Sequence, residues 1–326
     1  MSSLREIKDR IGSVRSTLKI TSAMKLVASS KLRKAQRTIE GLRPYEKALN
    51  EILSEVISGE YGSSTYCKTS ASLHPSQPDG WAPPVHEVTG DHGFTAGTTD
   101  RIEKDIESGC YKIAVVAVAS NSSLCGGFNA NVIKKALQTV SEYEQEGFEV
   151  EVHSLGRKMA EAMRKAGYDS PEDYSDLVAK PEYAKSCALA STLSKRFDEG
   201  RLGGIVLVYN HFVSTSKQEA VVEQYLPFPT GSSSVGFEQM TAESEYIIEP
   251  SKTEVVRTLM PQVLMLKFHS AVLDSAAAEH AARTVAMQTA TDNAQDLLGE
   301  LTLEYNKGRQ QKITSEILDL LGGATQ

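Results

Sequence analysis

The sequence predicts an α/β protein whose long amino- and carboxy-terminal helices pair as an antiparallel coiled coil, with a Rossmann-like α/β globular domain between them in the chain. Three patterns predict this fold class. A heptad repeat runs through 4–42, buried-strand and helix patterns alternate over 110–230, and a second long helical pattern runs through 254–321. We divide the 326 residues into 1–58 (amino-terminal coiled-coil helix), 59–108 (irregular insertion), 109–250 (α/β domain) and 251–326 (carboxy-terminal coiled-coil helix).

The first helix has an apolar seam that steps alternately by three and four residues, as a left-handed coiled coil requires. Two positions in the middle of the seam, Thr21 and Lys25, are polar, so we expect the seam to loosen there. Pro44 is a candidate interruption, after which the pattern resumes to about residue 58. A second apolar stripe lies beside the seam and consists of Ile20, Met24 and Val27.

Apolar runs and amphipathic segments alternate in the middle of the chain. "YKIAVVAVAS" and "GGIVLVYNHF" have the composition of buried parallel strands, and "FEVEVHSLG" predicts a further strand. Helical patterns at "NVIKKALQTVSEYEQEG", "RKMAEAMRKAG" and "KPEYAKSCALASTLSKRFDEG" separate these strands, and "EAVVEQYLPF" predicts an antiparallel strand. Right-handed crossovers would join the parallel strands into a small sheet.

The terminal helices are too long for a domain of this size to bury. At the helical rise they are about 85 Å and on the order of 100 Å long. Both join the middle of the chain at their inner ends, so the longer carboxy-terminal helix should project past Met1, from about Arg309. A polar cluster lies there and precedes an apolar stripe; the cluster is Asn306, Lys307, Arg309, Gln310, Gln311 and Lys312, and the stripe includes Ile313, Ile317 and Leu320.

Charge is distributed unevenly along the chain. Residues 1–47 hold twelve basic and four acidic side chains, a net charge of +8, whereas the whole chain has −7. Such an arm fits nucleic acid, an anionic membrane or an acidic protein partner. Aromatic residues do not interleave with the basic ones, which disfavours nucleic acid. No apolar run approaches the roughly 18 residues of a membrane-spanning helix, and the first residues resemble neither a secretory signal nor a typical transit peptide.

Candidate chemical sites are few. "SNSSLCGGFN", residues 120–129, lies between a strand and a helix, but the sequence has neither GxGxxG nor a P-loop. We interpret it as a tight turn with Cys125 as a buried thiol, and nucleotide binding is the less favoured alternative. Four scattered cysteines without CxxC predict reduced thiols. We expect no catalytic residue, cofactor or metal site; the candidate ligands Cys67, His74, His86 and His92 match no metal-binding spacing.

Two long segments at opposite ends resemble the gamma subunits of F-type ATP synthases. "LREIKDRIGSVRSTLKITSAMKLVASSKLRKAQ" resembles the amino-terminal signature of that family, and "AARTVAMQTATDNAQDLLGELTLEYNKGRQQKITSEILDLLGGA" its carboxy-terminal signature. "LCGGFN" and "YNHFVS" resemble internal motifs. The resemblance covers nearly the whole chain apart from the insertion. It implies a non-catalytic central rotor shaft that couples proton flow through the membrane c-ring to conformational cycling of the beta catalytic sites.

The resemblance also implies partners and a location. The shaft would stand inside a ring of alpha and beta subunits, and the globular foot would rest on the c-ring with the epsilon subunit. The protein would lie on the cytoplasmic side of the cell inner membrane, and it would bind neither nucleic acid nor a small-molecule substrate directly. Six residues match family positions that contact other subunits: Met24, Lys25, Arg309, Gln310, Thr314 and Glu316.

The chain departs from the family pattern in three places. Ser22 stands where Lys is more common, which removes one basic contact. Asn121, Ser122 and Ser123 replace the usual "DRG", so we expect different pairing beside the turn. The insertion is longer than the common form and is expected to decorate the foot or lower stalk; the chain has no match to the regulatory dithiol of chloroplast forms.

Other interpretations stay open from the sequence. The chain could be a coiled-coil adaptor on a Rossmann-like domain without a rotary partner. A nucleotide-dependent enzyme is a third class, which the missing phosphate loop disfavours. The polar cluster near Arg309 also fits a merely solvated helix end.

Overall fold

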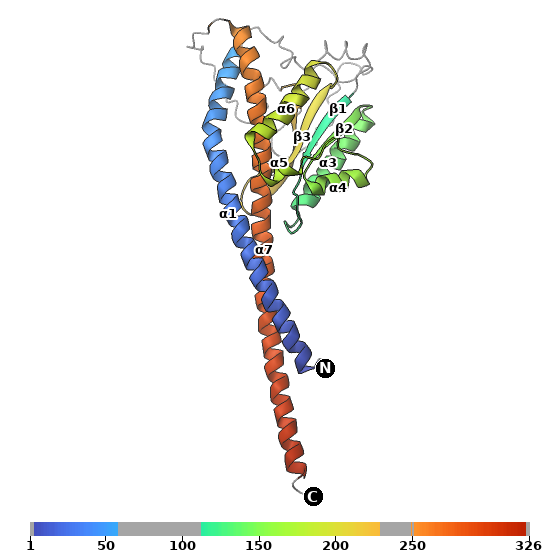
Figure 1. Ribbon diagram of the computed structural model, residues 1–326, viewed down its shortest axis with the longest axis vertical. Coiled ribbons are helices and arrows are strands. Elements are labelled where there is room, and N and C mark those ends of the chain that lie inside the picture. Colours follow the sequence, from blue (N-terminus) through green and yellow to red (C-terminus); the bar gives the residue numbers. More distant parts are fainter. Residues whose placement is uncertain (1–2, 58–111, 229–248, 250, 324–326) are drawn as a thin grey trace, which may run out of the picture.

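Two long helices run side by side along the molecule, and a small α/β unit lies against one end of the pair (Figure 1). The computed structural model describes residues 3–57, 112–228, 249 and 251–323. We call α1 (Leu4–Ile57) and α7 (Lys252–Gly323) the helical pair. They run antiparallel, as predicted, so the beginning of α1 lies beside the later part of α7. The predicted insertion over 59–108 lies outside the described residues.

Both long helices begin with the same capping arrangement. The Oγ of Ser3 accepts a hydrogen bond from the backbone N–H of Glu6 at 3.2 Å, and that of Ser251 accepts one from Glu254 at 3.3 Å. Ser followed three residues later by Glu is the capping-box pattern, which satisfies amide groups that the first helical turn leaves free.

The expected interruption at Pro44 is wrong, because α1 is helical on both sides of this residue. A proline inside a helix removes one backbone hydrogen bond. Beyond it, Leu49 and Leu53 are 7% and 0% exposed and belong to the main hydrophobic core. Their packing against that core holds the last turns of α1 in line.

The predicted seam of α1 faces α7. Each seam position from Leu4 to Leu42 is buried or half-buried, and Ala28 and Leu32 are almost fully covered. The neighbouring apolar stripe points elsewhere, since Ile20 is 60% and Val27 57% exposed.

The α/β unit contains the predicted four-stranded sheet, with strand order β2-β1-β3-β4. The strands β1, β2 and β3 are parallel, and β4 is antiparallel to β3. The short helix α5 was not predicted. The strands are β1 (Lys112–Val118), β2 (Glu149–Leu155), β3 (Gly204–Phe212) and β4 (Gln218–Leu226), and the helices are α3 (Phe128–Gln145), α4 (Arg157–Lys165), α5 (Ser175–Ala179) and α6 (Tyr183–Asp198).

Helices cover both faces of this sheet, which explains the continuous apolar run of β1. Ala114 and Val116 face a core shared with α6 and α7, whereas Ile113 and Val115 face α3 and α4. A central parallel strand buried on both faces has no polar side to alternate with.

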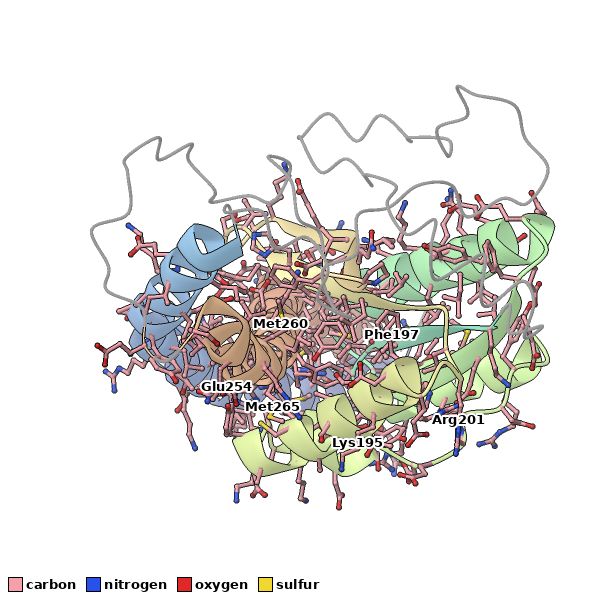
Figure 2. The ribbon with its side chains drawn as sticks, turned by 90° about the horizontal axis from the view of Figure 1, so that it is seen from above. Lys195, Phe197, Arg201, Glu254, Met260 and Met265 are labelled. Carbon is pink, nitrogen blue, oxygen red and sulfur yellow. The ribbon has the colours of Figure 1, made fainter. Side chains whose placement is uncertain are left out.

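The start of α7 completes the first of these cores and thereby fixes the helical pair to the α/β unit. In Figure 2, Phe197 of α6 and Met260 of α7 lie towards the interior, and both are almost fully buried. Lys195 and Glu254, on the same two helices, are exposed.

Candidate functional site

The most distinctive surface is the part of α7 that extends beyond α1. A Cβ atom on Gly308 would lie 3.0 Å from Cδ2 of Leu4, so the start of α1 closes against this glycine. Every side chain from 309 to 318 is exposed. The predicted overhang therefore begins at Arg309, and at the helical rise its residues to Gly323 span about 20 Å.

The polar side chains predicted to contact other subunits lie on this overhang. Arg309, Gln310, Thr314 and Glu316 are all exposed. The Thr314 hydroxyl donates to the carbonyl of Gln310 at 2.9 Å, and Lys312 pairs with Glu316 at 3.8 Å. An exposed i,i+4 pair of this length contributes little stability, so these groups are available to a partner.

Apolar side chains are also exposed on the overhang. Ile313 is 47%, Ile317 51% and Leu318 62% exposed. Grouped apolar side chains on one helix end are typical of a surface that another protein covers. The side chain of Leu320, the last member of the predicted stripe, lies outside the described residues.

The other two predicted contact residues lie on the paired part of the two helices, away from the overhang. Met24 and Lys25 are half-buried, and the Lys25 ammonium donates to Oε1 of Gln288 at 2.5 Å. From Gln288 to Arg309 the distance along α7 is about 30 Å at the helical rise. The six predicted residues thus form two separate levels, and they stay predicted contacts.

Polar partners fill the position where the seam was expected to loosen. The Thr291 hydroxyl donates to the Thr21 hydroxyl at 2.9 Å, one turn from the Lys25–Gln288 bond. We call these four residues the polar layer. The interval from Leu4 to Thr21 equals that from Thr291 to Gly308, so the two helices keep one register between these points. Aligning the helices antiparallel from the predicted overhang could have found both partners.

Residues 120–129 form the predicted tight turn between β1 and α3. Leu124 and Gly126 have positive φ, 69° and 58°. The Asn129 side chain occupies the turn, because its Oδ1 accepts from the backbone N–H of Ser120 at 3.1 Å and from its hydroxyl at 2.9 Å. Cys125 is 1% exposed, which confirms the buried thiol.

Two residues of this turn that depart from the family pattern, Asn121 and Ser122, have partners outside the turn. Asn121 donates to the carbonyl of Ser175 at 2.7 Å and accepts from the backbone N–H of Arg157 at 3.0 Å. Ser122 accepts from the Arg283 guanidinium of α7 at 2.9 Å, and Arg283 also pairs with Glu279 at 2.5 Å. These contacts tie the turn to α7, a role that the sequence alone did not show.

The described residues offer neither a metal-binding cluster nor a membrane-spanning helix. Among the described residues, no group of three or more His, Cys, Asp or Glu side chains could hold a metal ion. Within those ranges, no helix is both long enough and apolar enough to cross a bilayer. The candidate ligands Cys67, His74, His86 and His92 lie outside the described residues.

Comparison with known proteins gives one consistent result. A family model described as ATP synthase matches residues 3–326. The ATP synthase gamma chain of Bacteroides fragilis is 42% identical over 326 residues, which are 99% of each chain. The gamma chain of Flavobacterium johnsoniae is 37% identical over 99% of this chain and 98% of its own.

Solved structures show the same fold at lower identity. One similar chain comes from an OSCP/F1/c-ring structure of the Euglena gracilis mitochondrial ATP synthase, with a TM-score of 0.55 at 18% identity. The match spans 99% of this chain and 93% of the Euglena chain. A chain of the rotor structure of the same enzyme has a TM-score of 0.53 at 17% identity, with 95% and 98% covered. The sequence relatives, the family match and the shared fold agree, and this chain belongs to the gamma-chain family of ATP synthases.

Proposed function

We propose that the chain is the central rotor shaft of an F-type ATP synthase, which couples proton flow through the membrane c-ring to conformational cycling of the beta catalytic sites during ATP synthesis or hydrolysis. The observation that carries this proposal is the overhang of α7, where every described side chain from 309 to 318 is exposed. A solitary helix with a polar band beside exposed isoleucines fits a collar of surrounding subunits.

Under this proposal the two parts of the molecule have different partners. The helical pair is the shaft inside the alpha and beta subunits, and the α/β unit is the foot on the c-ring beside the epsilon subunit. The similar Euglena chains belong to structures described as a rotor and as an OSCP/F1/c-ring assembly, which supports this arrangement. The chain is itself non-catalytic, holds no cofactor, and lies peripherally on the cytoplasmic side of the cell inner membrane.

The two levels of predicted contacts would serve the shaft in different ways. Arg309 and Gln310, with Thr314 and Glu316, would meet loops of the beta subunits. Lys25 would share its ammonium group between Gln288 and a partner, because an ammonium has three donors. Met24 lies next to it and adds a flexible apolar contact.

A paired substitution tests the polar band. Arg309→Ala with Gln310→Ala should weaken assembly or the coupling of ATP hydrolysis to proton transport about tenfold, or ~1.4 kcal/mol, because both lie at the start of the overhang. Lys307→Ala is the matched control, since it is exposed on the same turn but precedes the last contact with α1. Equal effects of the two variants in purified complexes would contradict the assignment.

Co-purification separates the remaining functional classes. A stable complex of the tagged full chain with alpha and beta ATPase subunits is expected. A monomer that binds nucleotide tightly would instead support the enzyme alternative. A folded chain that is purified without alpha and beta subunits and without nucleotide would support the adaptor alternative.

A further inference from the structure

The carboxyl end of β3 is a joint between the α/β unit and the helical pair. The ring of Phe212 packs against two small cores. One contains Leu32 of α1 with Ala277 of α7, and the other contains Cys125 and Phe128 of the α/β unit. Phe212 therefore contacts both parts of the molecule at once.

A single carboxylate of α7 holds this end of the strand. The Oδ1 of Asp274 accepts from the backbone N–H of Phe212 at 3.2 Å, and its Oδ2 lies 2.5 Å from Nδ1 of His211. The Asp274 side chain is 19% exposed and that of His211 is 50% exposed. The pair is thus anchored on the helix side and open to solvent on the strand side.

The charges around His211 are mainly negative. Besides Asp274 on α7, Glu219 lies directly opposite on β4 and is itself paired with Lys217 at 2.5 Å. Glu223 lies further along β4. The hydrogen bond to Asp274 raises the pKa of His211, the charges of Asp274, Glu219 and Glu223 raise it further, and burial opposes them.

The other histidines of the described residues behave in the opposite way. Burial lowers the pKa of His153 and His269, and burial together with Arg283 and Lys31 lowers the pKa of His280 to about 4. Within the described ranges, His211 is therefore the histidine that favours a proton.

We propose that His211 and Asp274 form a protonation-sensitive clasp that fixes the α/β unit to the helical pair. This inference goes beyond the proposed function, because it concerns the folded chain whether or not it is assembled. When His211 is protonated, an ion pair reinforces the Asp274–Phe212 bond. As pH rises through the raised pKa, the imidazole loses its charge and only the neutral contacts remain.

Hydrogen exchange of the Phe212 amide in the full-length chain tests the clasp. After correction for intrinsic exchange, protection should be about threefold to tenfold greater near pH 5.5 than near pH 8.5, two values on either side of an ordinary histidine pKa. His211→Lys keeps a fixed charge and should stay protected at both values. His211→Gln should stay weakly protected at both, and Lys217→Gln, the control on β4, should behave as the unaltered chain.

Two results would overturn the clasp. One is a pH dependence in His211→Gln equal to that of the unaltered chain. The other comes from NMR titration of the His211 ring: Asp274→Asn should bring its pKa back towards about 6.5, so an unchanged pKa would show that Asp274 does not act on it. The histidine is half exposed, so its replacements leave the core intact.

Discussion

Glu151 shows how much a single side chain depends on contacts that are distant in sequence. It lies on the outer strand β2, and its two oxygens each accept from the Arg196 guanidinium of α6 at 2.7 Å. The Nζ of Lys112 lies 3.5 Å from Oε2 of Glu151, and Nε2 of His153 lies 2.9 Å from its Oε1. The hydrogen bonds from Arg196 lower the pKa of Glu151 to about 2, although burial opposes the shift.

This pair predicts a defined acid sensitivity. A carboxyl group whose pKa is lower in the folded state contributes stability above its unfolded pKa and loses it as pH falls towards the folded value. Glu151→Gln should therefore reduce the free energy of unfolding by about 2 kcal/mol at pH 7, and the deficit should shrink between pH of about 4.5 and 2.

Denaturant unfolding at several pH values measures this deficit. Glu149→Gln is the control, because Glu149 lies on the same strand with 72% exposure and its pair with Lys112 should contribute at most about 0.5 kcal/mol. A constant deficit for Glu151→Gln from neutral to acid pH would show that charge is not the cause.

At this scale, sequence patterns predicted local features and missed distant pairs. The turn at "LCGGFN" was predictable because two glycines between a strand and a helix permit tight backbone geometry. The Arg196–Glu151 and His211–Asp274 contacts were not, because each joins residues far apart along the chain. Such contacts exist only after the sheet and helices have packed.

Among the secondary-structure elements, α1 and α7 combine an apolar seam with the polar layer of Thr21, Lys25, Gln288 and Thr291. Buried polar groups in a coiled coil reduce stability but penalise shifted alignments, because a shift leaves them opposite apolar side chains. Thr21 is 8% exposed and meets Thr291. The alignment of this layer places Leu4 against Gly308, and it thereby sets where the overhang begins.

Removal of the threonine pair should separate stability from alignment. Thr21→Val with Thr291→Val should raise the free energy of unfolding by about 0.5–1 kcal/mol, since apolar groups then fill the seam. A disulfide between cysteines introduced at Leu4 and Gly308 should form less completely, because the alignment is less strict. Thr289→Val, on the exposed side of α7, is the control and should change neither measurement. An unchanged disulfide yield would refute a role of the threonine pair in alignment, whatever the change in stability.

For the whole molecule, the shape followed from lengths that the sequence already contained. The helices have 54 and 72 residues, so an antiparallel pair joined at one end must leave the longer one bare at the other. The interruption expected at Pro44 is wrong because a proline acts only on local backbone bonding, whereas Leu49 and Leu53 beyond it pack into the main core. The placement of α7 against the sheet was not predictable from periodicity, since its apolar residues there surround more than one face of the helix.

The insertion gives a test on the same scale. Figure 1 shows the end of α1 and the start of β1 at the same end of the molecule, far from the overhang. Replacement of residues 59–108 by a short Gly/Ser linker should therefore leave co-assembly with alpha and beta subunits within about twofold of the full chain. Loss of the complex, with helix content by circular dichroism unchanged, would mean that the insertion contributes to assembly.

The solitary end of α7 has a consequence for how the chain is put together. A short helix without tertiary packing is only marginally stable in water. The turns of α7 after Gly308 lie beyond the start of α1 and are stabilised only by the helix that precedes them. We therefore expect unwinding of α7 in the free chain to start in these turns, where Ile313 and Ile317 are exposed. When a partner encloses these turns, the helix loses conformational entropy and the two isoleucines become buried in the same step. Binding of a partner would then complete the folding of the chain. We therefore expect newly made chain to be most stable when its partners are present as it is synthesised.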